Sequence, residues 1–187
     1  MIEEVRKACN HLKNGKTILY PTDTIWGIGC DATNNKAVSS IYKIKQRTDS
    51  KNMLILLDNP GRLTSYIREI PEVAWDLIEA TDTPMTIIYP GAKNLAPQLI
   101  AGDGSIGIRI TSDPFCVRLI QQFGKPIVST SANISGTEPP SLFEEIEDEI
   151  RDHIDYVVDW RRYESASIAP SSIIKLDESG RITILRP

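Results

Sequence analysis

The sequence has few of the residues that bridge loops or hold metals. Its 187 residues include three cysteines and two histidines. The cysteines Cys9, Cys30 and Cys116 are odd in number and lie far apart without a CxxC pair, so we expect no disulfide framework. The histidines His11 and His153 match no metal-ligand spacing. This pattern predicts reduced thiols, no structural metal and a reducing compartment.

Long apolar runs and a strong excess of one charge are also missing. The longest clean apolar run, residues 53–57, cannot span a bilayer, and Glu3 and Glu4 stand where a signal peptide would be basic. The net charge of −4 gives no nucleic-acid footprint in the total, so any anion site must be a local cluster of cations. Length and composition suit one buried core. We expect a soluble, cytoplasmic protein with a single domain over residues 1–187.

Two well-known phosphate motifs are absent or weak. The sequence contains no GxxxxGK[ST], which excludes a P-loop protein. Gly27, Gly29 and Ala32 match GxGxxA, but Tyr20 ends the preceding strand too early and Asp31 would face a pyrophosphate. A tight turn that needs glycine is the better interpretation of these residues.

Helical and strand patterns alternate along the chain. Helices are expected over residues 2–13, 34–46 with Asp31 or Thr33 as the cap, 59–66, 71–80, 113–124 and 141–150, the last opened by a capping box from Ser141 to Glu144. Strands are expected over residues 16–20, 53–57, 86–89, 106–110, 127–129, 156–158, 172–176 and 182–185, with a hairpin turn at 177–180. This alternation predicts an α/β fold with a mixed, twisted sheet.

Three polar groups are candidates for anion binding. Lys45 and Arg47 converge on one anion only if their helix ends near Gln46. Cations at a helix C-terminus also complement its dipole, and that role would affect stability rather than turnover. Residues 129–136 follow a strand and offer short hydroxyl and amide donors, although an ordinary polar loop has the same composition. Arg109 alternates with apolar neighbours and needs an anionic partner, from either the protein or a ligand.

Further hydroxyl groups follow strands near both ends of the chain. Thr22 and Thr24 come after a short apolar run that Pro21 ends, a position where loops often contact ligands. Ser171 and Arg186 lie near the last strands. No Cys–His or Ser–His pair with a supporting carboxylate is evident. These hydroxyl, amide and cationic groups therefore suit the binding and electrostatic stabilisation of phosphate rather than covalent catalysis. We expect residues 18–47 to form one wall of a nucleotide site and residues 129–136 to form the other.

At these residues the sequence resembles the YrdC/TsaC family, the threonylcarbamoyl-AMP synthases. The most specific elements are K-x-R at Lys45 and Arg47 and S-x-N at Ser131 and Asn133. The resemblance implies a YrdC-like α/β fold, in which helices pack around a twisted mixed sheet with an open, concave, positively charged cavity. It also implies that L-threonine, bicarbonate and ATP give threonylcarbamoyl-AMP and pyrophosphate, for threonylcarbamoyladenosine modification of tRNA.

The resemblance assigns roles position by position. Threonine would be held by Thr22, Arg109 and Ser171, with Arg109 facing the carboxylate. ATP and the carboxylated intermediate would be held by Lys45, Arg47, Ser105, Ser131, Asn133 and Arg186, and the catalytic set would be Lys45, Arg47, Ser131 and Asn133. Mg²⁺ would accompany ATP on its phosphates, without a protein carboxylate cage. A tRNA-modifying threonylcarbamoyltransferase would accept the product.

Two other functions stay open at this point. An RNA-binding maturation factor of the same fold would bind double-stranded RNA or tRNA through a basic concave patch, which the acidic total charge mildly disfavours. A YciO-like relative would share the fold without synthase activity. Such relatives depart at K-x-R and S-x-N, whereas both elements are complete here.

Overall fold

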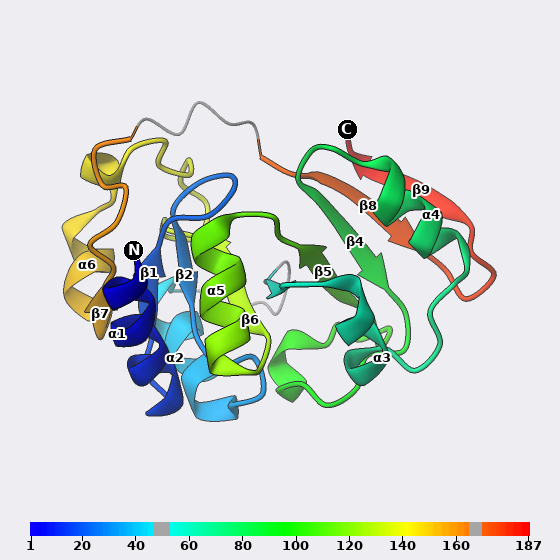
Figure 1. Cartoon of the computed structure of the whole chain (residues 1–187), viewed down its shortest axis with the longest axis horizontal. Helices are drawn as coiled ribbons and strands as arrows, with labels where there is room; N and C mark the ends of the chain where they lie inside the picture. The colour runs from blue at the N-terminus through cyan, green and yellow to red at the C-terminus, as the bar shows by residue number, and fades with distance from the viewer. Residues whose placement is uncertain (47–52, 165–169) are drawn as a thin grey trace.

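Figure 1 shows the computed structural model, which describes residues 1–46, 53–164 and 170–187. Within these residues the strands are β1 (Ile18–Tyr20), β2 (Gly27–Gly29), β3 (Leu54–Leu57), β4 (Met85–Tyr89), β5 (Ile106–Ile110), β6 (Ile127–Ser131), β7 (Tyr156–Val157), β8 (Ser172–Leu176) and β9 (Ile182–Arg186). They form one nine-stranded sheet in the order β7-β1-β2-β6-β3-β5-β4-β8-β9. The pairs β1–β7, β3–β5 and β4–β8 are parallel and the other neighbours are antiparallel. The predicted α/β fold with a mixed sheet is therefore confirmed.

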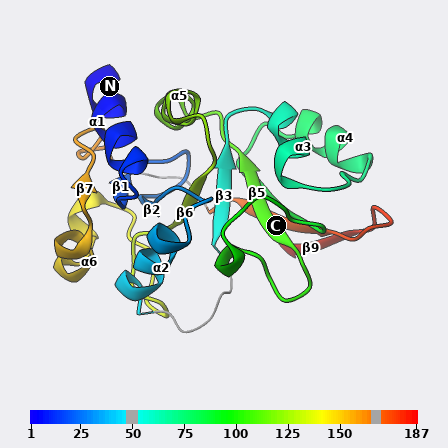
Figure 2. The same ribbon diagram turned by 90° about the horizontal axis from the view of Figure 1, so that it is seen from below.

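Helices cover both faces of the sheet. They are α1 (Ile2–Lys13), α2 (Asn35–Ile44), α3 (Leu63–Tyr66), α4 (Val73–Ala80), α5 (Pro114–Phe123) and α6 (Asp148–His153), with 3₁₀ turns η1 (Pro60–Arg62), η2 (Pro97–Leu99) and η3 (Phe143–Glu145). The helices α1 and α5 pack together on one face, and α2 lies on the opposite face (Figure 2). Successive residues of β3 serve the two faces, because Leu56 packs with α1 and α5 while Ile55 and Leu57 join the other core. None of the described helices is long and apolar enough to cross a membrane.

The ends of α5 follow directly from its sequence. The side chain of Asp113 accepts a hydrogen bond from the Cys116 N–H at 2.9 Å, and Pro114 occupies the first turn, where its missing N–H costs nothing. Gly124 ends the helix at φ 82°, in the left-handed region that glycine adopts without strain. The predicted helix over residues 113–124 is confirmed.

The predicted cap of the second helix was wrong. Asn34 caps α2, because its Oδ1 accepts hydrogen bonds from the N–H groups of Lys36 and Ala37. Asp31 turns instead toward Thr33 and forms an ion pair with Lys125 at 2.8 Å. The carboxylate lies too far before the first turn to reach its N–H groups, so the residue directly before the helix takes the role.

The predicted capping box and helix over residues 141–150 were also wrong. Glu145 accepts hydrogen bonds from the backbone N–H groups of Ser141 and Leu142, and the turn that they close is a short 3₁₀ turn. The helix α6 begins later, at Asp148, and ends at His153. The acidic segment therefore folds as a turn and a separate short helix.

The strand β2 was missed, because its two glycines were interpreted as a tight turn. Gly27 and Gly29 lie in the sheet between β1 and β6, so the GxGxxA match is no dinucleotide-binding loop. A Cβ atom at Gly29 would come within 2.6 Å of Tyr20 Cε1 and 2.8 Å of the Val128 carbonyl oxygen. Glycine is required there by close packing and not by a turn.

Glu4 joins α1 to the strand β7, and we expect this contact to make the stability of the fold depend on pH. Its carboxylate accepts hydrogen bonds from the Tyr156 hydroxyl, the Lys7 ammonium and the Asp159 N–H. Burial opposes ionisation of Glu4, but these hydrogen bonds outweigh it and lower its pKa from 4.5 to about 2. Because the folded-state pKa is lowered, the ionised group stabilises the fold above pH 4.5, and this contribution is lost as the pH falls through about 2.

The measurement is the melting temperature between pH 7 and pH 2. The Glu4 contribution at neutral pH is up to about 3 kcal/mol, so the wild type should lose more stability on acidification than Glu4→Gln does. Glu3→Gln is the matched control, because the Glu3 side chain is 68% exposed on the same helix. Parallel pH profiles for the wild type and Glu4→Gln would contradict this expectation.

Candidate active site

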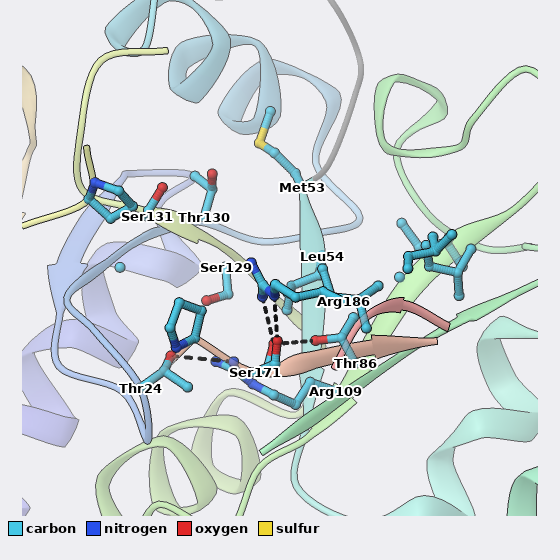
Figure 3. Close-up of a pocket in the computed structure, with 18 of the residues that line it drawn as sticks. Thr24, Met53, Leu54, Thr86, Arg109, Ser129, Thr130, Ser131, Ser171 and Arg186 are labelled. Atoms are coloured by element: carbon cyan, nitrogen blue, oxygen red, sulfur yellow. Dashed lines mark hydrogen bonds between the residues drawn. The ribbon is translucent and has the colours of Figure 1, made fainter. Parts of the chain in front are cut away.

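A cavity of about 730 Å³ opens over the middle of the sheet. In the register Leu54 pairs with both Ser129 and Gly107, so these three lining residues share one face. Figure 3 shows how the labelled side chains lie around it, with Ser129, Thr130 and Ser131 on one side and Thr86, Ser171 and Arg186 on another. The loop at residues 22–26 and the segment 129–136 both contribute, as predicted for the two walls.

Cationic side chains dominate the charge of this cavity. Among the described residues that line it, Lys45, Arg109, Lys175 and Arg186 are cationic, and Asp103 is the one carboxylate. The chain as a whole has a net charge of −4. A local cluster of cations therefore lies in an acidic protein, and such a concave site attracts anions.

Lys45 reaches the cavity from the end of α2. The helix ends at Ile44, and Gln46 follows with φ 49°, close to the helix end that the sequence required. The Lys45 side chain is buried, and its Nζ donates hydrogen bonds to the carbonyl oxygens of Ser131 at 2.5 Å and Asn133 at 2.6 Å. Lys45 thus joins α2 to the end of β6, which is more than a complement to the helix dipole. Arg47 lies outside the described residues.

The end of β6 forms a compact polar turn around Asn133. The Ser131 hydroxyl donates to Asn133 Oδ1 at 2.5 Å, and Asn133 Nδ2 donates to the carbonyl oxygens of Ile134 and Thr137. The S-x-N spacing therefore closes a turn in which the serine hydroxyl, the asparagine amide and the Lys45 ammonium come together. The strand extends two residues beyond the predicted end at Ser129, which carries Ser131 into the cavity wall.

Arg109 is buried in β5 and also lines the cavity. Its Nη2 lies 3.0 Å from Asp23 Oδ1, and its Nη1 donates to Thr24 Oγ1 at 3.3 Å. The anionic partner that the sequence demanded is therefore a protein carboxylate. Arg109 Nε has no hydrogen-bond partner among the described residues, although it is buried. The guanidinium can accept a further anion, so a protein partner and a ligand role are compatible here.

Thr22 and Ser171 line the same cavity as Arg109. Thr22 Oγ1 donates to the Ile25 carbonyl oxygen at 2.7 Å and fixes the tight loop after β1. Ser171 Oγ lies 3.0 Å from Thr86 Oγ1, and Arg186 Nε donates to the Ser171 carbonyl oxygen at 2.8 Å (Figure 3). Burial, and to a smaller extent the charge of Arg109, lower the pKa of Arg186. The guanidinium groups of Arg109 and Arg186 therefore both place positive charge in the cavity.

Ser105 belongs to a polar cluster at another part of the wall. Its hydroxyl donates to Asp103 Oδ1 at 2.6 Å, and Lys175 Nζ lies 2.6 Å from Asp103 Oδ2. The hydrogen bond from Lys175, followed by that from Ser105, outweighs burial and lowers the pKa of Asp103 to about 2. Asp103 therefore stays ionised and ties the loop before β5 to β8.

The structure brings together every described residue for which the sequence predicted a role. Those that line the cavity are Thr22, Lys45, Ser105, Arg109, Ser131, Asn133, Ser171 and Arg186. Sequence reasoning missed Thr86, Asp103 and Lys175, which line it as well. Lys175 alternates with apolar residues inside β8, the same signal that identified Arg109, so it could have been found. The described residues contain no group of three or more His, Cys, Asp or Glu side chains that could hold a metal ion.

Comparison with known proteins identifies the family. A family model described as "Sua5_yciO_yrdC: Telomere recombination" matches residues 10–187. The threonylcarbamoyl-AMP synthase of Pseudoalteromonas translucida (strain TAC 125) is 37% identical over 158 residues, which are 83% of this chain and 84% of that protein.

Two solved structures share the fold. The crystal structure of P. abyssi Sua5 complexed with L-threonine matches 98% of this chain with a TM-score of 0.88 and 26% identity. The match covers 53% of that Sua5 chain, so this chain spans about half its length. The crystal structure of E. coli YciO matches 100% of this chain and 89% of YciO, with a TM-score of 0.83 and 26% identity. The chain belongs to the Sua5/YciO/YrdC family.

Proposed function

We propose that this protein is a threonylcarbamoyl-AMP synthase, which forms threonylcarbamoyl-AMP and pyrophosphate from L-threonine, bicarbonate and ATP. Its membership of the family, and the 37% identity to a protein of that name, support the proposal. One observation carries it: all eight described residues to which the resemblance assigns a role line one cavity, and four of its five charged lining residues are cationic. In reaction class the protein would be a nucleotidyltransferase.

Threonine would bind beside Arg109, and the P. abyssi relative was crystallised with this amino acid. A guanidinium with an unpaired Nε suits a carboxylate, because planar donors match two carboxylate oxygens. The hydroxyl groups of Thr22 and Ser171 would hold the rest of the molecule. Arg186 is held against Ser171 and adds positive charge nearby.

ATP would bind toward the end of β6. Lys45, Ser131 and Asn133 offer an ammonium, a hydroxyl and an amide around one turn, all suited to phosphate oxygens. Ser105, directly before β5, and Arg186, at the end of β9, would also contact the nucleotide. Arg47, which lies outside the described residues, is proposed to add a second cation to the phosphate site.

The chemistry that this cavity supports is the joining of two anions. The neutral amino group of threonine first reacts with bicarbonate, and the new N–C bond gives an N-carboxylated amine with loss of one water molecule. A carboxylate oxygen of that group then attacks the α-phosphate of ATP, and pyrophosphate leaves. Cations that hold both reactants, here Arg109 on threonine and Lys45 on phosphate, lower the barrier by positioning and by charge neutralisation.

Mg²⁺ would enter with ATP. Asp103 is the one carboxylate among the described lining residues, and Lys175 and Ser105 already occupy it, so the donor set fits a metal carried by phosphates. When bound, Mg²⁺ would neutralise phosphate charge. The chain's own task is then to hold the phosphate oxygens through Lys45, Ser131 and Asn133.

The product has to reach a second protein. A tRNA-modifying threonylcarbamoyltransferase would take the threonylcarbamoyl group, and we propose that both act in the cytoplasm.

The deciding experiment is pyrophosphate release from ATP by the purified protein. Release should require both L-threonine and bicarbonate, and mass spectrometry should detect threonylcarbamoyl-AMP. Allothreonine is a matched control, because it presents the same groups with a different arrangement at Cβ. ATP consumption without dependence on threonine, or RNA binding without turnover, would overturn the proposal.

A further inference from the structure

Arg109 is oriented by a loop and not by its own strand. The two contacts of its guanidinium go to Asp23 at 3.0 Å and to Thr24 at 3.3 Å, both in the loop after β1. The side chains of Arg109 and Asp23 are 4% and 9% exposed. The direction in which the guanidinium meets the cavity therefore depends on how firmly this loop holds the carboxylate.

Asp23 is held from behind the cavity wall. Its Oδ2 accepts a hydrogen bond from Thr111 Oγ1 at 3.0 Å, and Thr111 Oγ1 accepts one from the Asp113 N–H at 3.2 Å. Asp113 forms an ion pair with Arg161 at 2.8 Å, and Arg161 donates to the Thr22 carbonyl oxygen at 3.1 Å. We call Asp23, Thr111, Asp113 and Arg161 the backing network.

None of the four members of the backing network lines the cavity. Arg161 adopts φ 56°, a left-handed conformation that costs a residue other than glycine some strain, and its contacts with Asp113 and the Thr22 carbonyl oxygen help to hold it there. The network ties the loop that carries Thr22 to the N-terminal end of α5, at its cap Asp113. The loop is thereby fixed to a helix through residues that do not themselves line the cavity.

The backing network matters because two guanidinium groups share the cavity. Arg186 and Arg109 carry like charges, and the charge of Arg109 contributes to the lowered pKa of Arg186. Without a fixed anion, a buried guanidinium would turn toward other oxygens or toward water. A fixed guanidinium, in contrast, binds a carboxylate without first losing its own freedom of rotation.

We propose that Asp23 is a positioning residue that directs Arg109 toward the carboxylate of threonine, and that Thr111 and the rest of the backing network hold Asp23 in place. This inference rests on the proposed function. It predicts that loss of the Asp23 charge weakens the binding of threonine far more than the binding of ATP. If Asp23 only neutralised Arg109 and stabilised the fold, its loss would lower the affinities for threonine and ATP equally or leave both unchanged.

The test is calorimetric titration of L-threonine and, separately, of ATP. The proteins are the wild type, Asp23→Asn, Arg109→Lys and the double variant. Asp23→Asn should lower the affinity for threonine about tenfold or more, which is the effect of losing one well-directed charge-assisted hydrogen bond. The affinity for ATP should change less than about twofold. The double variant should bind threonine no more weakly than the weaker single variant, because Asp23 acts through Arg109.

Asp58→Asn is the matched control. Asp58 is also a buried carboxylate in an ion pair with an arginine, Arg62 at 2.9 Å, and does not line the cavity. It should leave threonine affinity unchanged. If Asp23→Asn does not fold, Thr111→Val replaces it as the test. This variant keeps the charges of Asp23 and Arg109 but removes the hydrogen bond from Thr111 to Asp23. It should lower the affinity for threonine about threefold.

The outcomes separate this inference from the proposed function. Wild-type protein that binds no threonine would overturn the proposed function and the role of Asp23 with it. Intact wild-type binding, with unchanged or tighter threonine binding in Asp23→Asn, would overturn the role of Asp23 alone. Additive losses in the double variant, or equal losses for threonine and ATP, would do the same.

Discussion

Replacement of Lys45 by alanine is expected to lower pyrophosphate release by about ten- to a few-hundred-fold, because a charge-assisted hydrogen bond to phosphate is worth roughly 1.5–3 kcal/mol. From the sequence alone we expect little loss of stability, because Lys45 and Arg47 carry like charges that repel each other in the empty site. The structure changes that expectation, since the buried ammonium satisfies the carbonyl oxygens of Ser131 and Asn133. Leaving both oxygens unpaired should cost about 1–3 kcal/mol in the free energy of unfolding.

The assay must therefore separate turnover from unfolding. Pyrophosphate release is measured well below the melting temperature of each variant, and thermal melts are recorded beside it. Lys43→Ala is the matched control, because Lys43 is an exposed cation in the last turn of the same helix and complements its dipole equally. Lys43→Ala should keep normal turnover. Normal turnover in Lys45→Ala would remove Lys45 from the catalytic set.

Gly29→Ala is expected to destabilise the fold by about 2–4 kcal/mol, which lowers the melting temperature by roughly 5–15 °C. The new Cβ would meet Tyr20 Cε1 at 2.6 Å and the Val128 carbonyl oxygen at 2.8 Å. Tyr20 is fully buried and donates its hydroxyl to the same carbonyl oxygen at 3.2 Å, so neither the ring nor the backbone can move away easily.

Thermal denaturation provides the measurement, with Gly102→Ala as the control. A Cβ atom at Gly102 would meet nothing within 4 Å, and Gly102 is not in the left-handed region. Gly102→Ala should melt close to the wild type. Equal melting temperatures for the two variants would show that the sheet can adapt at Gly29, contrary to the packing argument.

The parts of the fold that sequence reasoning predicted are those with local signals. Asp113 and Gly124 mark the ends of α5 within the helix itself, and the β8–β9 hairpin has its turn beside its strands. The strand β2 carries no such signal, because two of its three residues are glycines, and the requirement for glycine at Gly29 comes from Tyr20 and Val128 on neighbouring strands. A strand pattern is read from side chains, and glycine has none.

The candidate site divides in the same way. Lys45 and Asn133 belong to short motifs, so a resemblance could name them before the structure brought them together. Asp23 lies between Thr22 and Thr24 in the loop after β1, but its partner Arg109 lies in the distant strand β5 and Thr111 directly follows that strand, so sequence spacing could not predict these contacts. The roles assigned to individual residues, and the single domain over residues 1–187, stay predictions.

The strand order has a consequence for how this chain folds. The strand β6 lies between β2 and β3, and β7 pairs with β1 although most of the sequence separates them. Neither half of the chain can therefore complete its part of the sheet from its own strands. Long loops must close before these strands can pair, and the entropy lost in closing them is compensated only after pairing. Refolding should therefore be slow compared with proteins whose contacts are mostly local in sequence. During that interval the unpaired edges of β1, β2 and β3 are exposed to other chains, so concentrated refolding should favour aggregation.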